Sequence, residues 1–161
     1  MTILTLGNEV LRQEAKDVTN INGETKRLIQ ELFETMQVGR GIGLAGPQVG
    51  VLQRIFVVQL AEDIPRVFIN PVIKGVSVES SQYEEGCLSI PGIYADVERP
   101  EKVSIEAWDE RGKPFRLDAE GLLARVIQHE MDHLKGILFI DHLSELKRKR
   151  ILRIWEQKFK A

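Results

Sequence analysis

The strongest constraint on the fold is the pentad His129-Glu130-Met131-Asp132-His133, which lies in a segment whose apolar residues repeat at helical spacing. Successive residues of an α-helix are rotated by about 100°, so His129 and His133 project from one face and can bind the same metal ion. Glu130 lies beside them as a candidate base. The segment therefore predicts a metal-binding helix that supports hydrolysis.

The two histidines share their side of this helix with apolar residues. Leu122 and Val126 fall within about 60° of His129, and a buried imidazole needs a partner that a metal ion can supply. The helix is predicted to begin at Asp118 or Ala119 and to end at Gly136. An apolar arc continues on one side, and a polar arc occupies the rest of the surface, with Arg125, Gln128, Asp132 and Lys135.

Length and composition favour a single domain spanning residues 1–161. A chain of 161 residues with 43% hydrophobic residues can bury one core but is too short for two ordinary domains. No apolar run approaches the roughly 20 residues of a membrane span, and residues 1–6 lack the features of a signal peptide. We therefore expect a cytoplasmic protein with no membrane partner.

The remaining sequence predicts an α+β protein. Asn22 is a candidate cap for a helix over 24–37, and Val, Ile and Phe are concentrated in three candidate strands, 54–60, 66–70 and 72–78. Residues 102–109 and 115–117 read as a hairpin. A final helix capped by Ser144 is predicted to anchor to the core through an apolar stripe of Leu146, Ile151, Leu152, Ile154, Trp155 and Phe159.

The third metal ligand is not decided by spacing alone. A catalytic metal site usually has three protein ligands, so the two histidines need one more. The only cysteine, Cys87, follows a glycine and offers a soft thiolate, which favours it modestly. The alternatives are Asp132, Asp141, His142 and Glu145.

A glycine-rich segment, Gly41-Ile42-Gly43-Leu44-Ala45-Gly46-Pro47-Gln48-Val49-Gly50, precludes regular helix. It combines many glycines with apolar residues of the kind that are usually buried. This favours a backbone that closely approaches a ligand over a plain connector.

Together, three segments resemble the signature motifs of the bacterial peptide deformylases: the glycine-rich segment through Gln48, the run Glu85-Gly86-Cys87-Leu88-Ser89, and the pentad followed by Leu134. The resemblance covers essentially the whole chain. It implies a compact single α+β domain in which antiparallel sheets pack around a central metal-binding helix, with N-terminal and C-terminal helices.

The resemblance also implies a metal site and a reaction. Cys87, His129 and His133 would bind one divalent metal, natively Fe(II), with Zn, Ni or Co as substitutes. Metal-bound water would attack the formyl carbon of an N-formylmethionyl nascent peptide and release formate, with Glu130 as general acid and base. The side-chain amide of Gln48 and the backbone N–H of Leu88 would stabilise the oxyanion.

The expected peptide contacts come from two strand-like segments. The backbones of Ile42 and Gly43, and of Glu85 and Gly86, are predicted to bind an extended peptide by strand addition. Leu122 and Val126 are interpreted either as lining for the methionine pocket or as ordinary core.

The chain departs from the family pattern in two places. Gly46 stands where the family usually has alanine, which costs about 0.5–1 kcal/mol of loop entropy and adds no bulk near Gln48. Some relatives also have an arginine that contacts the peptide in the region of Tyr94, which leaves that role unassigned here. Arg99 is hypothesised instead to pair with Asp132 and support the metal helix.

Two rival functions share some of these features. A zincin-type protease also uses the pentad, although its third ligand normally lies downstream. A noncatalytic RNA-associated module would use its metal structurally and bind through residues 144–161, which hold seven Lys or Arg against two Glu, a local charge of +5. In a deformylase the same basic helix could dock on ribosomal RNA. No feature indicates a DNA partner.

Overall fold

The main sheet of the protein has five strands in the order β1-β2-β3-β6-β7, and every neighbouring pair is antiparallel. The computed structural model describes residues 1–158 in full and the backbone of Phe159. The strands of this sheet are β1 (Gly43–Ala45), β2 (Ile55–Val58), β3 (Arg66–Val76), β6 (Lys102–Trp108) and β7 (Pro114–Glu120). The predicted hairpin is confirmed as β6–β7, while the two strands predicted over 66–78 form one strand, β3, with register shifts.

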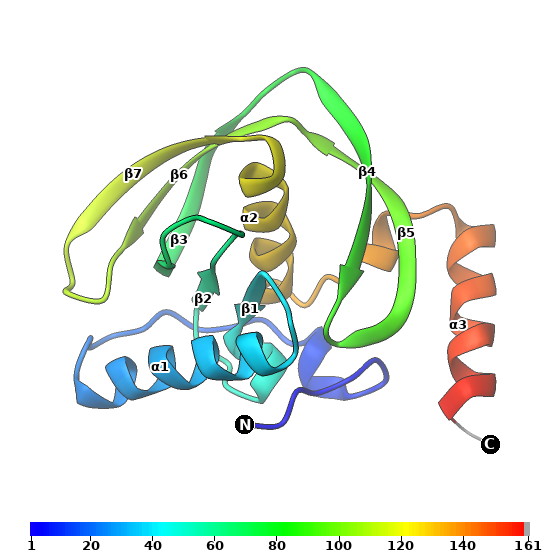
Figure 1. Cartoon of the computed structure of the whole chain (residues 1–161), viewed down its shortest axis with the longest axis horizontal. Helices are drawn as coiled ribbons and strands as arrows, with labels where there is room; N and C mark the ends of the chain where they lie inside the picture. Colours follow the sequence, from blue (N-terminus) through cyan, green and yellow to red (C-terminus); the bar gives the residue numbers. More distant parts are fainter. Residues whose placement is uncertain (160–161) are drawn as a thin grey trace.

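Two further strands, β4 (Ser80–Cys87) and β5 (Ile90–Pro100), pair only with each other among the described residues. They form a long ribbon that stands apart from the five-stranded sheet (Figure 1). Neither strand was predicted from the sequence. A two-stranded ribbon is only marginally stable by itself. Its side chains must therefore hold it against the rest of the protein.

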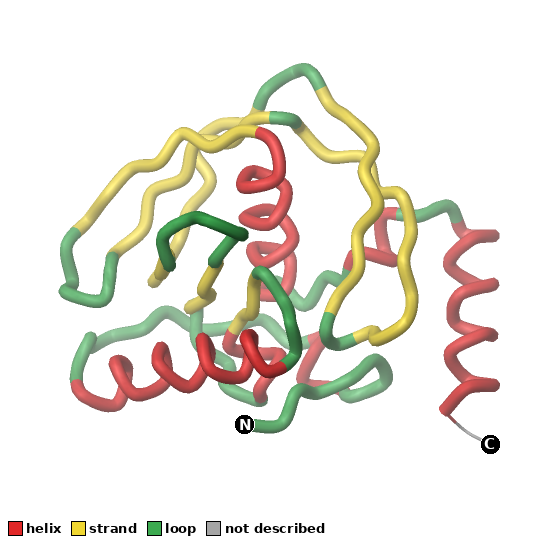
Figure 2. Tube along the Cα trace, viewed as in Figure 1, coloured by secondary structure: helices red, strands yellow, loops and turns green. Residues whose placement is uncertain are grey.

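Helix α2 (Gly121–Leu134) carries the pentad and lies between the five-stranded sheet and the ribbon (Figure 2). Its Val126, Ile127 and Met131 belong to a buried cluster that includes Phe56 and Phe68 of the sheet. The predicted start of this helix was wrong, because β7 continues to Glu120 before the chain turns at Gly121, which has a φ of 63°. The helix does end before Gly136, as predicted.

Two residues of the polar arc of α2, Arg125 and Gln128, are also buried, whereas Lys135 is exposed. The side chains of Arg125 and Gln128 face the ribbon, where they bond to main-chain carbonyls and, in the case of Arg125, to Glu85. The helix is therefore enclosed on both its apolar and its polar side.

Helix α1 (Gly23–Val38) follows the predicted cap, with the Asn22 side chain accepting from the N–H groups of Glu24 and Thr25. It packs Leu28, Ile29 and Leu32 into a second buried cluster. Three short 3-10 helices, η1 (Glu9–Arg12), η2 (Gly46–Val49) and η3 (Phe139–His142), connect these elements.

Helix α3 (Glu145–Phe159) lies at the outside of the molecule, beside β5 (Figure 1). Ser144 caps it by accepting from the N–H of Lys147. Trp155 is buried, but the predicted anchor Leu146 is 73% exposed and Ile154 is exposed as well, so the predicted apolar stripe was only partly right. The side chain of Phe159, also assigned to the stripe, lies outside the described residues.

The N-terminal segment joins two distant parts of the chain. The N–H of Leu4 donates to the carbonyl of Gln48 at 2.7 Å, and that of Leu6 donates to Ser89 at 2.9 Å. Through residues 1–158, none of the helices is long and apolar enough to cross a lipid bilayer.

Candidate metal centre and substrate cleft

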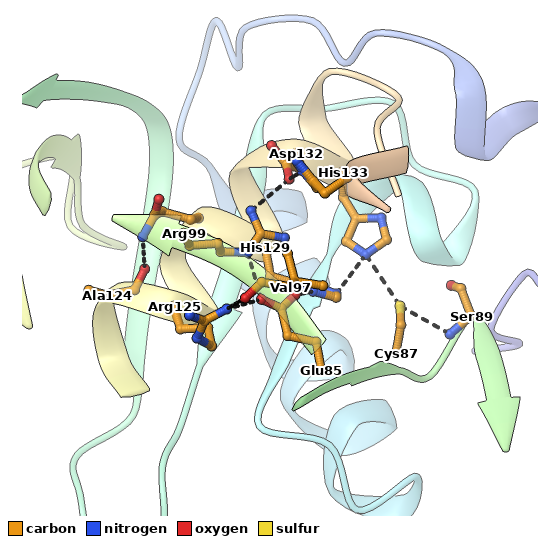
Figure 3. A network of polar contacts seen from close by, with 12 residues as sticks. Glu85, Cys87, Ser89, Val97, Arg99, Ala124, Arg125, His129, Asp132 and His133 are labelled. Atoms are coloured by element: carbon orange, nitrogen blue, oxygen red, sulfur yellow. Dashed lines mark hydrogen bonds and ion pairs between the residues drawn. The ribbon is translucent and has the colours of Figure 1, made fainter. Parts of the chain in front are cut away.

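Three donor atoms converge where the ribbon meets helix α2. Cys87 ends strand β4, and its Sγ lies 3.4 Å from His133 Nε2, which in turn lies 3.3 Å from His129 Nε2. Figure 3 shows the His133 ring directed at the Cys87 thiol. Of the His, Cys, Asp and Glu residues in the described chain, only these three form a group with metal-ligand spacing.

The spacing of these atoms fits a tetrahedral ion. Bonds of about 2.0–2.1 Å to nitrogen and 2.3 Å to sulfur place neighbouring ligand atoms about 3.3–3.6 Å apart. Burial lowers the pKa of His133 well below its usual range, which keeps that ring neutral as metal ligation requires. The donor set therefore fits a divalent metal, and a soft thiolate with two imidazoles suits iron, zinc, nickel or cobalt.

Glu85 fixes the orientation of the His129 ring. Burial alone would raise the pKa of Glu85, but hydrogen bonds from His129 and Arg99 outweigh it and lower the pKa to about 2. An ionised carboxylate only accepts hydrogen bonds, so His129 Nδ1 donates to Glu85 Oε1 at 2.9 Å. The lone pair of His129 Nε2 is thereby left for the metal.

Two arginines hold the Glu85 carboxylate in place. Arg99 of β5 donates to both of its oxygens, at 2.6 and 3.1 Å, and Arg125 of α2 donates to Oε2 at 2.6 Å (Figure 3). Arg99 also donates to Asp132 at 2.9 Å, which confirms the hypothesised pairing of these two residues. The role of Arg125 was not predicted, because the sequence shows only an arginine on a helix that had to be buried.

The other candidates for the third ligand have different partners. Asp132 binds Arg99 and lies 2.7 Å from His142, while Asp141 accepts from Arg12 and Glu145 pairs with Lys149. None of these four belongs to the group with metal-ligand spacing within residues 1–158. Cys87 is therefore the donor that the geometry selects.

Glu130 lies beside the donor group and is only 3% exposed. Its Oε1 has no hydrogen-bond partner in the described part of the chain, although buried carboxylate oxygens are normally paired. Burial raises the pKa of Glu130 to about 7. A buried, unpartnered carboxylate with this pKa is suited to receive and return a proton near neutral pH.

Gln48 is held beside the thiol by the glycine-rich segment. Its Oε1 accepts from the N–H of Ala45 at 3.0 Å, and its Nε2 donates to Ser89 Oγ at 3.1 Å and lies 3.5 Å from Cys87 Sγ. The side chain is 1% exposed. Ser89, which the sequence analysis did not single out, therefore helps to aim the amide of Gln48 at the site.

The effect of alanine at position 46 is steric as well as entropic, because there is little space for a Cβ there. A Cβ at this position would lie 2.7 Å from the carbonyl oxygen of Val51 and 3.0 Å from that of Gln53. Alanine at position 46 therefore requires a shift of the backbone around Gln48.

Leu88 closes the other side of the site. Its side chain packs against the backbone before β1, so closely that a Cβ on Gly41 would lie 2.6 Å from Leu88 Cδ1 and one on Gly39 would lie 3.2 Å away. These two glycines thus allow the glycine-rich segment to contact the turn after Cys87.

A cleft of about 560 Å3 opens beside the donor atoms. Strands β1 and β4 each pair on one side only among the described residues, and both contribute to its walls. All the predicted peptide-binding residues line it, namely Ile42, Gly43, Glu85, Gly86, Leu122 and Val126. The side chain of Glu85 is committed to the histidine and the arginines, so only its backbone is available to a peptide.

A Cys-His-His donor group, a buried carboxylate and a peptide-sized cleft with free strand edges together define the class of metal-dependent hydrolases that act on amide bonds. Residues 1–149 match the family model described as polypeptide deformylase. The chain therefore belongs to the polypeptide deformylase family.

Individual relatives agree with this assignment. The peptide deformylase of Azotobacter vinelandii is 52% identical over 153 residues, which cover 94% of this chain and 91% of the relative. The crystal structure of peptide deformylase from Ehrlichia chaffeensis has a TM-score of 0.96 at 33% identity, covering 99% of this chain and 97% of that one. The Synechococcus elongatus enzyme in complex with actinonin has a TM-score of 0.92 at 46% identity, covering 96% and 86%.

Proposed function

We propose that this protein is a metal-dependent hydrolase that removes the N-formyl group from the N-terminal methionine of newly synthesised peptides and releases formate. The observation that carries the proposal is the unpartnered carboxylate of Glu130 beside the Cys87, His129 and His133 donor group. Membership of the deformylase family supports the choice of reaction.

The three donor residues would hold one divalent ion. When bound, such an ion polarises the formyl oxygen and makes a water molecule acidic enough to attack at neutral pH. We infer Fe(II) as the native metal from the resemblance to the deformylase family, while the donor set itself suits Zn, Ni or Co equally.

Glu130 would carry the proton through the reaction. Its carboxylate takes a proton from the attacking water as the oxygen bonds to the formyl carbon, and then gives that proton to the amine nitrogen as the carbon–nitrogen bond breaks. Burial raises the pKa of Glu130 and favours its protonated form, which supports its uptake of a proton from the attacking water.

Gln48 and Leu88 would stabilise the negative charge that develops on the formyl oxygen. The Gln48 amide is held by Ala45 and Ser89 before any substrate binds, and such prior orientation is what makes an oxyanion donor effective. The backbone N–H of Leu88 follows Cys87 directly and is the proposed second donor.

The peptide itself would lie between β1 and β4 in an extended conformation. The free edges of the two strands offer the backbones of Ile42, Gly43, Glu85 and Gly86 for hydrogen bonding. Leu122 and Val126 line the same cleft and would contact the methionine side chain, although Val126 also belongs to the buried cluster.

The test is to purify the protein without oxygen, quantify its metal and measure amine release from a formyl-methionyl tripeptide, with and without a chelator. We expect turnover that the chelator abolishes and that Glu130→Gln loses by about 10²- to 10⁴-fold while keeping its metal. Cleavage of internal, unformylated peptides would instead support a zincin-type protease. Bound metal without any turnover would favour the noncatalytic module.

We further propose that the basic first turns of α3 dock the enzyme on ribosomal RNA in the cytoplasm, where nascent chains emerge. Residues 147–150 are four consecutive cations on a helix at the outside of the molecule. Replacing all four with glutamine leaves Trp155 in place and should weaken ribosome co-sedimentation and its dependence on salt. Unchanged co-sedimentation by this variant would contradict docking through α3.

A further inference from the structure

Arg125 is a buried cation that the reaction itself does not use. Its side chain is 8% exposed and makes three hydrogen bonds: Nη1 donates to Glu85 Oε2 at 2.6 Å and to the Val97 carbonyl at 2.9 Å, and Nη2 donates to the Ser81 carbonyl at 2.8 Å. The guanidinium also lies 5.6 Å from the ring centroid of Tyr83. Every one of these partners belongs to the β4–β5 ribbon.

The ribbon depends on such contacts because, among the described residues, it shares no strand pairing with the five-stranded sheet. One metal donor, Cys87, is carried by the ribbon, whereas the other two are carried by α2. The distance between the thiol and the imidazoles therefore depends on how the ribbon is fastened to the helix. Arg125 reaches both strands of the ribbon from α2.

Arg125 is one of two arginines that compensate the charge of Glu85, and the other, Arg99, is shared with Asp132. Arg99 contacts both Glu85 and Asp132, Asp132 also contacts His142, and Arg125 contacts Glu85 alone of the two carboxylates. Without Arg125, one buried negative charge is left uncompensated beside the His129 ring, and Glu85 Oε2 loses one of its two donors.

We propose that Arg125 is a positioning residue of the metal centre, which fixes the Glu85 carboxylate behind His129 and holds the Cys87-bearing ribbon against α2. This inference rests on the proposed assignment of Cys87, His129 and His133 as ligands. Arg125 also lines the cleft, whereas Arg99 does not. Of the two arginines that bind Glu85, Arg125 is therefore the one that would lie next to a bound peptide.

The test compares Arg125→Met and Arg125→Lys with Arg116→Met, a control at an exposed arginine of β7. Each protein is loaded with Co(II), and the rate of metal loss to excess chelator and the visible spectrum are recorded. We expect Arg125→Met to lose metal about 10-fold faster or more and to show altered thiolate-to-cobalt and ligand-field bands. Arg125→Lys should be intermediate, since one ammonium cannot reach all three acceptors, and Arg116→Met should match wild type.

The outcomes distinguish a positioning role of Arg125 from a role in folding alone and from a wrong ligand assignment. If Arg125→Met fails to fold, Arg125→Lys keeps the charge and carries the test alone. Wild-type rates and spectra in folded Arg125 variants overturn the proposal while leaving the ligand assignment intact. Failure of the wild-type protein to bind Co(II) contradicts the ligand assignment itself and with it the role of Arg125.

Discussion

Helices α2 and α3 are nearly equal in length, at 14 and 15 residues, yet they are held in opposite ways. In α2, charged residues such as Arg125 and Glu130 are buried together with apolar ones, and the charges have specific roles. In α3, the large apolar side chains of Leu146 and Ile154 are exposed, and the helix contacts the core mainly through the side of Trp155. The comparison shows that burial follows the partners a residue finds rather than its polarity.

The largest difference between the two helices should concern metal binding. His133 is buried on α2 and faces Cys87, whereas His142 lies just before α3 and contacts Asp132. We expect His133→Ala to purify without stoichiometric metal and without deformylase activity, because one of three donors is lost. His142→Ala is the matched control and should keep its metal, as measured by elemental analysis. Full metal content in His133→Ala would contradict the ligand assignment.

The second largest difference is expected in how much the ion pairs of the two helices stabilise the fold. Glu85→Ala leaves Arg99 and Arg125 buried with too few negative partners, and we expect a loss of about 3–5 kcal/mol in the free energy of unfolding. Glu145→Ala removes an exposed pair with Lys149 on α3 and should cost less than about 0.5 kcal/mol. Urea denaturation of the metal-free proteins measures both. Similar losses in the two variants would show that the buried network does not stabilise the fold.

Core packing of α2 gives a third test. Ile127 is fully buried against the five-stranded sheet, so Ile127→Ala removes a well-packed side chain and leaves a cavity. We expect a loss of about 2–5 kcal/mol, seen as a lower urea midpoint. A loss below 1 kcal/mol would mean that the five-stranded sheet shifts towards α2 and fills the cavity.

The smallest effect is expected on α3. Leu146 is mostly exposed, so Leu146→Ala should change the free energy of unfolding by no more than about 0.5 kcal/mol in either direction. The same denaturation experiment measures it. A loss as large as that of Ile127→Ala would indicate that Leu146 contacts a partner, and the comparison of the two helices would need revision.

The sequence predicted the parts of this structure that depend on local signals. Asn22 capping, the β6–β7 hairpin and the grouping of Cys87 with the two histidines all follow from short motifs, the last with help from the family resemblance. The ribbon was missed because its buried face carries Glu85 and Arg99, which breaks the alternation of apolar and polar residues. These two charges pair with each other across the ribbon, and their remaining partners, Arg125, His129 and Asp132, come from α2. Partners so distant in the chain leave no local pattern.

The short segment that precedes η1 has a consequence for how the protein assembles. Leu4 and Leu6 bond to the carbonyls of Gln48 and Ser89, so the first few residues bridge the two walls of the cleft. These contacts join parts of the chain that are far apart in sequence, and such contacts form late in folding. During synthesis, Leu4 and Leu6 can therefore make these bonds only after the segments that form both walls of the cleft have been synthesised.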